Sequence, residues 1–374
     1  MRVVKAALLS IENAVAWIRK EQRNYYRFGD GDALPNTIIT RVNDSGTARE
    51  CIDKLQTFIY GNGFADTNLG NSPANAEETF NKMLQTVSLH TSYSDAVTGR
   101  VLYDNSGNPA RFYPLPWQTL RRLGQDSFVY NPLMGTRDRR TNEDKYLRRY
   151  KQGESQADRL ARMNRQMSKY GEQFGDILYY FNPGVGMFYD VYSVPKYYSG
   201  IEDIESDIGV TRLERKNILG GWRTQVIIST GPIDKYVKDA NGDTAYDRLN
   251  KSIDSFVGDN ASVALLLDGA VGEQKPEVKT IPVADMLDQT EKATDRVGRK
   301  VCRHMGVPPV LVGFSTAGQL GNVQEMANTM ELFKLTVIKR QDLIRDALKT
   351  VFTQQNFEIS PLTIFQPSNE AAKV

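Results

Sequence analysis

The chain has only two cysteines and two histidines among its 374 residues, and this scarcity excludes several kinds of site. Cys51 and Cys302 lie far apart and form no CxxC pair, which excludes a disulfide framework and a cysteine zinc site, so we expect two buried thiols. His90 and His304 lie in no HExxH motif and at no ligand spacing from a cysteine. We therefore expect both histidines to be satisfied structural residues.

Long apolar runs are also missing. No segment approaches the roughly 18 to 20 apolar residues that cross a bilayer, and the mean hydropathy is −0.46. The first twenty residues have the apolar spacing of an amphipathic helix, but Glu12 and Asn13 interrupt them and no small-residue cleavage site follows. We expect an intracellular origin, no signal peptide and no membrane partner.

The common catalytic signatures are absent as well: the sequence contains no GxSxG elbow, no GxxxxGK[ST] phosphate loop and no dinucleotide GxGxxG. Carboxylates cluster at two places. The DGD at 30–32 lacks a third carboxylate at ligand spacing, so a plain turn is the simpler interpretation. Glu202, Asp203, Glu205 and Asp207 fall on the polar face of a predicted helix, where solvation or pairing between subunits accounts for them. We assign no catalytic residue, no metal and no cofactor.

Charge is nearly balanced overall, at +2, but it is unevenly distributed. Between Thr98 and Tyr170 there are fifteen Lys or Arg against seven Asp or Glu, and the rest of the chain is acidic. Two interpretations stay open. The segment is either a solvated helical face of mixed charge or a surface that docks onto an acidic partner or a phosphate backbone.

Apolar periodicity and turn residues predict a mixture of helices and strands, that is, an α+β fold. The predicted helices lie at 47–61, 76–95, 194–219, 246–256, 283–305 and 322–352, with charged helical sequence also running through Met167; the predicted strands form a hairpin about the turn 104–108, a second pair about 182–184, and segments at 222–230 and 262–280.

The stretch from Asp285 to Phe352 resembles the C-terminal signature of the portal protein (head-to-tail connector) family of tailed bacteriophages. A polar helix ends in MGVPPVLVG, a loop of small residues follows, and a helix then opens with GNVQEMANTMELF. Two upstream segments, RVLYDNSGNPARFYPLPWQTLRR and YSVPKYYSGIEDIESDIGVTRLERKNILGGWRTQVIIS, also resemble portal elements. Together they cover about half of the chain, in the order that the family has.

The resemblance implies a subunit of a ring, normally a dodecamer, with a wing, two stem helices, a clip inserted between the stems, and a helical crown. The crown is reduced here, since little follows Phe352. The expected parts are an N-terminal wing part at 1–75, the first stem helix at 76–97, the clip at 98–193, the second stem helix at 194–220, further wing at 221–305, the tunnel-loop region at 306–321, and a C-terminal wing helix with the reduced crown at 322–374.

The implied function is that of a channel at one capsid vertex of the virion, through which double-stranded DNA is packaged and ejected. The chain would be made in the cytoplasm of the bacterial host and would not be an enzyme. Its partners would be further copies of itself, the DNA, the terminase large subunit, the head-tail adaptor and the major capsid protein. Another head-tail adaptor is the first alternative, and a nucleic-acid-processing enzyme is the second.

Two sets of residues follow from the resemblance. The tunnel loop would contact a moving duplex through uncharged and mostly small side chains, without binding its phosphates tightly. Its residues are Phe314, Ser315, Thr316, Ala317, Gly318, Gln319, Leu320 and Gly321. Basic residues of the clip would dock the motor and then the adaptor; they are Arg137, Arg139, Arg140, Arg148 and Arg149.

Overall fold

The computed structural model describes residues 25–182, 191–219, 226–230, 264–268, 277–280, 283–314 and 323–362, with a few single residues between 238 and 247. Contacts divide the chain into two compact units: unit 1 is Met1–Ile204 with Arg299–Val374, and unit 2 is Glu205–Gly298.

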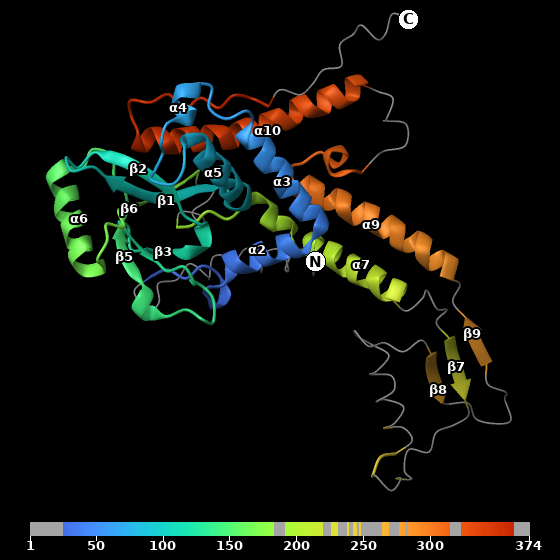
Figure 1. The fold of residues 1–374 in the computed structure, drawn as a ribbon. Helices are drawn as coiled ribbons and strands as arrows, with labels where there is room; N and C mark the ends of the chain where they lie inside the picture. Colours follow the sequence, from blue (N-terminus) through green and yellow to red (C-terminus); the bar gives the residue numbers. More distant parts are fainter. Residues whose placement is uncertain are drawn as a thin grey trace, which may run out of the picture. The chain divides into compact units, whose positions relative to one another are not determined.

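Helices and strands follow one another along the chain, and Figure 1 labels most of them. In unit 1 they are η1 (Asp30–Asp32), α2 (Leu34–Asp44), α3 (Gly46–Tyr60), α4 (Thr67–Asn71), α5 (Phe80–Ser94), β1 (Ala96–Tyr103), β2 (Pro109–Pro114), η2 (Trp117–Thr119), β3 (Leu120–Leu123), β4 (Ser127–Tyr130), η3 (Thr141–Glu143), β5 (Lys145–Arg148), α6 (Gln156–Tyr170), β6 (Asp176–Phe181), η5 (Lys196–Gly200), η6 (Pro309–Val312) and α10 (Val323–Val351). Unit 2 holds β7 (Val226–Thr230), β8 (Ala264–Asp268) and β9 (Glu277–Thr280), while α7 (Ile201–Leu219) and α9 (Val283–Met305) run through the boundary between the units.

The helices of unit 1 begin at side-chain caps. The Ser45 hydroxyl accepts a hydrogen bond from the Ala48 N–H at 3.1 Å at the start of α3, and Ser155 caps α6 in the same way. α3 ends at Gly61, whose φ of 59° favours glycine. Ser45 and Gly61 therefore mark the two ends of α3, and the predicted helix at 47–61 is confirmed.

α10 completes the core of unit 1 together with α3 and α5, beside which it lies in Figure 1. Phenylalanines that follow α10 pack against phenylalanines near α3 and α5. The ring centroids of Phe64 and Phe357 are 5.6 Å apart, and those of Phe80 and Phe352 are 5.7 Å apart. Each buried Phe contributes roughly 1.5–3 kcal/mol through the surface that it removes from water. The segment after α10 therefore returns to the core rather than leaving it at Phe352.

Two antiparallel sheets of three strands lie beside these helices. β1 is central in the order β2-β1-β6, and β4 is central in the order β3-β4-β5. The predicted hairpin is confirmed, because the Asp104 carboxylate accepts hydrogen bonds from the Ser106 and Asn108 N–H groups and Gly107 has a φ of 82°. The first sheet is joined to the second where the Tyr150 N–H donates to the carbonyl of Ile177 at 2.8 Å.

Unit 2 contains a three-stranded sheet with the order β8-β7-β9. β7 runs parallel to β8 and antiparallel to β9. These strands fall within the predicted segments 222–230 and 262–280. The predicted helix at 246–256 lies almost wholly outside the described residues.

One predicted element is wrong. The charged sequence that leads up to Met167 is predicted to be helical, but its earlier part forms η3 and β5, and the helix starts only at Gln156. Gly153, just before this helix, has a φ of 81°, which interrupts a helix. Leu147 is buried between exposed Tyr146 and Arg148, so the local burial has the period of a strand. The second strand predicted after residue 182 falls on 183–190, outside the described residues.

The two compact units do not coincide with the predicted parts of the chain. The segment 98–193, predicted as an inserted clip, shares its core with the N-terminal helices in unit 1. α5, which occupies most of the predicted first stem helix, buries Met83, Leu84 and Val87 in that core. The segment that separates from unit 1 is Glu205–Gly298.

Candidate functional site

The basic segment provides the candidate docking residues, and the structure separates one of them from the other four. Arg137, Arg140, Arg148 and Arg149 are exposed. Arg140 is 3.9 Å from Glu143, with 75% of its side chain exposed. These four side chains are accessible to a partner.

Arg139 is held inside unit 1, with 9% of its side chain exposed. Its guanidinium lies 2.6 Å from the Asp144 carboxylate and donates to the Tyr25 hydroxyl, also at 2.6 Å. Burial alone would lower the pKa of Arg139, but the bonds to Asp144 and Tyr25 raise it. Arg139 therefore ties the segment to the N-terminal part of unit 1, and its charge is not presented at the surface.

The DGD segment also proves to be more than a turn. Asp32 is buried with a φ of 64°, its carboxylate accepts a hydrogen bond from the Phe28 N–H at 2.9 Å, and it pairs with the fully buried Arg121. Arg121 also donates to the Asp32 carbonyl at 2.7 Å. This ion pair fixes the start of α2 against β3. Because Asp32 and Arg121 are 89 positions apart, no local signal in the sequence could have revealed the pair.

A second buried ion pair positions α6. Arg162 donates two hydrogen bonds to Glu154, at 2.6 and 2.5 Å, and two to Asp176, at 3.1 and 2.7 Å. Tyr103 donates to the same Asp176 carboxylate at 2.6 Å, and Asp176 is 1% exposed. Burial would lower the pKa of Arg162, but the two carboxylates raise it, so the side chain stays charged.

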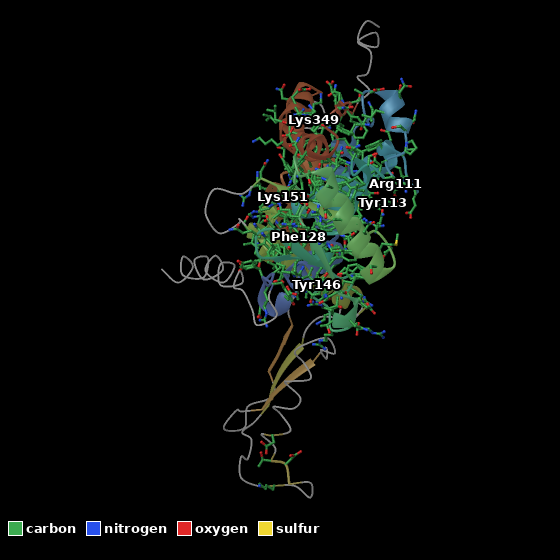
Figure 2. The ribbon with its side chains drawn as sticks, turned by 90° about the vertical axis from the view of Figure 1, so that its left-hand side faces the viewer. Arg111, Tyr113, Phe128, Tyr146, Lys151 and Lys349 are labelled. Carbon is green, nitrogen blue, oxygen red and sulfur yellow. The ribbon has the colours of Figure 1, made fainter. Side chains whose placement is uncertain are left out.

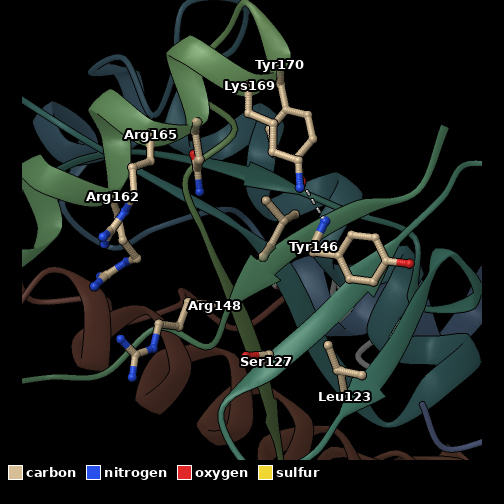
Figure 3. Close-up of a pocket in the computed structure, with 10 residues that line it drawn as sticks. Leu123, Ser127, Tyr146, Arg148, Arg162, Arg165, Lys169 and Tyr170 are labelled. Carbon is tan, nitrogen blue, oxygen red and sulfur yellow. Dashed lines mark hydrogen bonds between the residues drawn. The ribbon is translucent and has the colours of Figure 1, made fainter. Parts of the chain in front are cut away.

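Between α6 and the sheet β3-β4-β5 lies a groove of about 300 Å³. In Figure 3 the guanidinium groups of Arg148, Arg162 and Arg165 gather at one side of it, and Tyr146 and Tyr170 lie at the other. The remaining lining residues are Leu123, Ser127, Leu147, Gln166 and Lys169. None of these ten described lining residues is a carboxylate. Sequence reasoning counted the charges of this segment but did not predict the groove.

At the unit 1 ends of α7 and α9 the carboxylate of Asp203 pairs with two side chains of α9. An Asp203 oxygen lies 3.0 Å from His304 Nε2 and the other lies 3.3 Å from Lys300 Nζ. Gly200 allows this close approach, because a Cβ there would be 2.3 Å from the His304 ring. Asp207 is only 5% exposed, so of the two accounts given for the carboxylates of α7, solvation does not apply to it.

Of the two histidines, His304 is satisfied as expected, but His90 is not. His90 Nδ1 is buried with no hydrogen-bond partner among the described residues, and burial lowers the pKa of His90 to about 4. The two cysteines are buried, as predicted, but their separation in the sequence conceals a contact: the Sγ atoms of Cys51 and Cys302 are 3.9 Å apart.

The predicted tunnel loop is described only at its first residue. The Phe314 N–H donates to the Pro309 carbonyl at 3.0 Å, which closes the turn that follows η6, and the Arg299 guanidinium lies 6.0 Å from the centre of the Phe314 ring. Ser315 to Gly321 lie outside the described residues.

Among the residues that the structure describes, no three His, Cys, Asp or Glu side chains group in a way that could hold a metal ion. No helix within those residues combines the length and apolar content that a bilayer span requires.

Comparison with known proteins shows the class of fold. No protein-family model and no curated protein matches the sequence. Among solved structures, the chain is similar to one from the neck of a native gene transfer agent particle computed with C12 symmetry, with a TM-score of 0.53 and 13% identity over 90% of this chain and 86% of that one. It is also similar to a chain of the virion of the native gene transfer agent, with a TM-score of 0.52 and 12% identity over 87% and 83% of the two chains. A further match, with a TM-score of 0.44 and 9% identity over 85% and 90% of the two chains, is an HK97 family phage portal protein from Corynebacterium diphtheriae.

The chain therefore has an α+β fold of the kind found in virion neck components, and the matches extend over most of both chains. The α+β fold class predicted from the sequence is confirmed by this similarity.

Proposed function

We propose that this chain is a portal subunit that assembles into a ring at one capsid vertex and conducts double-stranded DNA during packaging and ejection. The observation that carries the proposal is the fold, shared over nearly the whole chain with a neck component of a particle that was computed with C12 symmetry. The portal-like order of sequence elements from Asp285 to Phe352 supports it independently. The role is structural and requires no catalytic group.

The structure favours a different assignment of the stem helices from the one that the sequence suggested. We propose that α7 and α9 are the stems and that the segment between them, which includes β7, β8 and β9, is the clip. Unit 2 supports this, because it consists of parts of two helices with a sheet between them in sequence. The segment 98–193 would then belong to the wing, since it shares the core of unit 1.

The tunnel loop keeps its proposed position between η6 and α10, with Phe314 at its start. Its small, uncharged residues suit a surface along which phosphates slide. We also keep the proposal that the basic segment docks a partner such as the terminase large subunit or the head-tail adaptor, but we restrict it to Arg137, Arg140, Arg148 and Arg149, because the charge of Arg139 is neutralised inside unit 1.

Negative-stain electron microscopy of the purified chain tests the proposed function. Annular particles with a central channel are expected. A monomer that cleaves nucleic acid would instead favour the enzyme alternative.

Docking is tested separately from assembly. Reversing the four exposed arginines to Glu is expected to weaken binding of the motor or adaptor and to leave the annular particles intact. The matched control reverses Lys82, Arg111, Lys339 and Lys349, which are also exposed. Equal binding by the two variants would refute a docking role for the basic segment.

A further inference from the structure

The groove beside α6 is a built feature of unit 1. Its α6 wall is fixed by the paired Arg162 and by Gln166, whose amide accepts from the Phe174 and Gly175 N–H groups at 3.0 and 2.8 Å and donates to the Gly175 carbonyl at 2.8 Å. Its other wall is the sheet strand β5. Because both walls are held by buried contacts, the groove exists before any ligand arrives.

The groove carries an excess of positive charge, and this excess destabilises α6. Arg162, Arg165 and Lys169 follow one another at spacings of three and four, so they lie on one face of α6. Like charges at this spacing destabilise a helix. Among the described residues, acidic side chains neutralise Arg162, through Glu154 and Asp176, and no ion pair of Arg165 or Lys169 is found there. Arg165 and Lys169 are exposed, and exposed Arg148 adds a third positive charge from β5. An anion in the groove would relieve this repulsion.

The shape of the groove argues against two kinds of anionic partner. An added β-strand is disfavoured, because the Tyr146 N–H of edge strand β5 already donates to the Tyr170 hydroxyl at 3.0 Å (Figure 3). A nucleic-acid duplex carries phosphates along a convex surface and binds to a track of cations. Here the cations surround one hollow of about 300 Å³ that also has two tyrosine rings in its lining.

Carboxylate side chains fit this chemistry. Arg162 shows the geometry within the groove itself, since its guanidinium holds two carboxylates, each through two hydrogen bonds. Arg148 and Arg165 have the same planar guanidinium group, which can donate two parallel hydrogen bonds to a carboxylate. Lys169 lies 5.6 Å and 5.1 Å from the ring centres of Tyr146 and Tyr170, so apolar surface and positive charge are offered together.

We propose that this groove binds an acidic peptide segment of a partner protein, with Arg148, Arg165 and Lys169 pairing with its Asp or Glu side chains and Tyr146 packing against an apolar neighbour. The inference goes beyond the proposed ring and does not require it, because the groove lies wholly within unit 1.

Fluorescence anisotropy with the purified full chain tests the proposal. The probe is a fluorescein-labelled peptide of Asp and Glu residues interspersed with Leu and Phe, and its Asn and Gln counterpart is the neutral control. The variant is R165E/K169E, and the matched control is R111E/K349E, which has the same charge change at exposed positions. Figure 2 shows Arg111 and Lys349 well away from Tyr146.

The expected result is binding of the acidic peptide at low ionic strength, at least about tenfold weaker in R165E/K169E than in R111E/K349E. The neutral peptide should not bind. Because charge reversal could disturb α6, R165Q/K169Q is measured alongside, and circular dichroism checks that each variant is folded. The glutamine variant should also lose the peptide.

Three results would overturn the proposal. The first is equal weakening by the groove and control variants, which would indicate long-range charge alone. The second is a short DNA duplex that binds at least as tightly as the peptide and is lost in the same variant. The third is no binding of the acidic peptide at all. Mass photometry of the same samples separates this test from the proposed function, since a chain that binds the peptide without forming rings would refute the ring and not the groove.

Discussion

Replacing Arg162 with Met should be among the most damaging single changes in unit 1. The substitution leaves Asp176, which is 1% exposed, without its charged partner, and it also leaves Glu154 unpaired. Removing one partner of a buried ion pair costs about 3–5 kcal/mol. Tyr103 still donates a hydrogen bond to Asp176 in the variant, so we expect a loss near the lower end of that range, about 3 kcal/mol. A typical domain unfolds with about 5–15 kcal/mol, so the loss would be a large fraction of the total.

Urea unfolding followed by tryptophan fluorescence measures this loss. Trp117 is buried in unit 1, and replacing Trp17 and Trp222 with Phe makes it the sole tryptophan of the chain. Arg111→Met is the matched control, because Arg111 is exposed and its replacement should change the free energy of unfolding by less than about 0.5 kcal/mol.

A second substitution tests the cause. In Arg162→Met/Asp176→Leu the buried carboxylate is gone, so most of the lost stability should return. The reasoning is refuted if Arg162→Met lowers the urea midpoint no more than Arg111→Met does, or if the double variant is less stable than the single one.

Three further outcomes follow from buried groups. Burial lowers the pKa of His90 from 6.5 to about 4. Between these pH values the unfolded chain therefore binds a proton that the folded chain does not. The free energy of unfolding is full above pH 6.5 and falls by at most about 3 kcal/mol toward pH 4. The urea midpoint of His90→Gln should not fall between pH 6.5 and pH 4, and a fall equal to that of the unsubstituted chain would assign the pH dependence to another group. Gly200→Ala should lower the thermal midpoint, because the new Cβ would collide with the His304 ring, and an unaltered midpoint would show that the helix ends can separate at no cost. Cys51 and Cys302 are 0% exposed, so a thiol reagent should modify neither in the native chain and both after denaturation, whereas rapid labelling of the native chain would contradict their burial.

Local signals in the sequence were sufficient for most elements of the fold. Ser45 and Gly61 mark the ends of α3, and Asp104 with Gly107 marks the first hairpin. These residues act on the backbone within a few positions of themselves, so their effect does not depend on the rest of the chain.

Charge counting was less informative about the site. The count of basic residues treated Arg139 and Arg140 alike, although one is buried against Asp144 and the other is largely exposed. It also treated Arg162 and Arg165 alike, although Arg162 is neutralised by Glu154 and Asp176 and Arg165 is exposed. Whether an arginine is structural or available depends on partners distant in sequence, and a single sequence does not reveal them.

The division into units was missed for a related reason. Amphipathic periodicity identified the α5 and α7 segments as helices but could not show which protein surface each one covers. α5 packs its apolar face inside unit 1. The contacts among segments 205–298, rather than any local pattern, define unit 2.

The ring is the claim on which the proposed function depends, and the mass of the native particle tests it most directly. Mass photometry across a range of protein and salt concentrations should find a closed assembly of many 42.1 kDa chains, about half a megadalton for twelve copies. A chain that stays at the mass of a single copy under every condition would contradict the account.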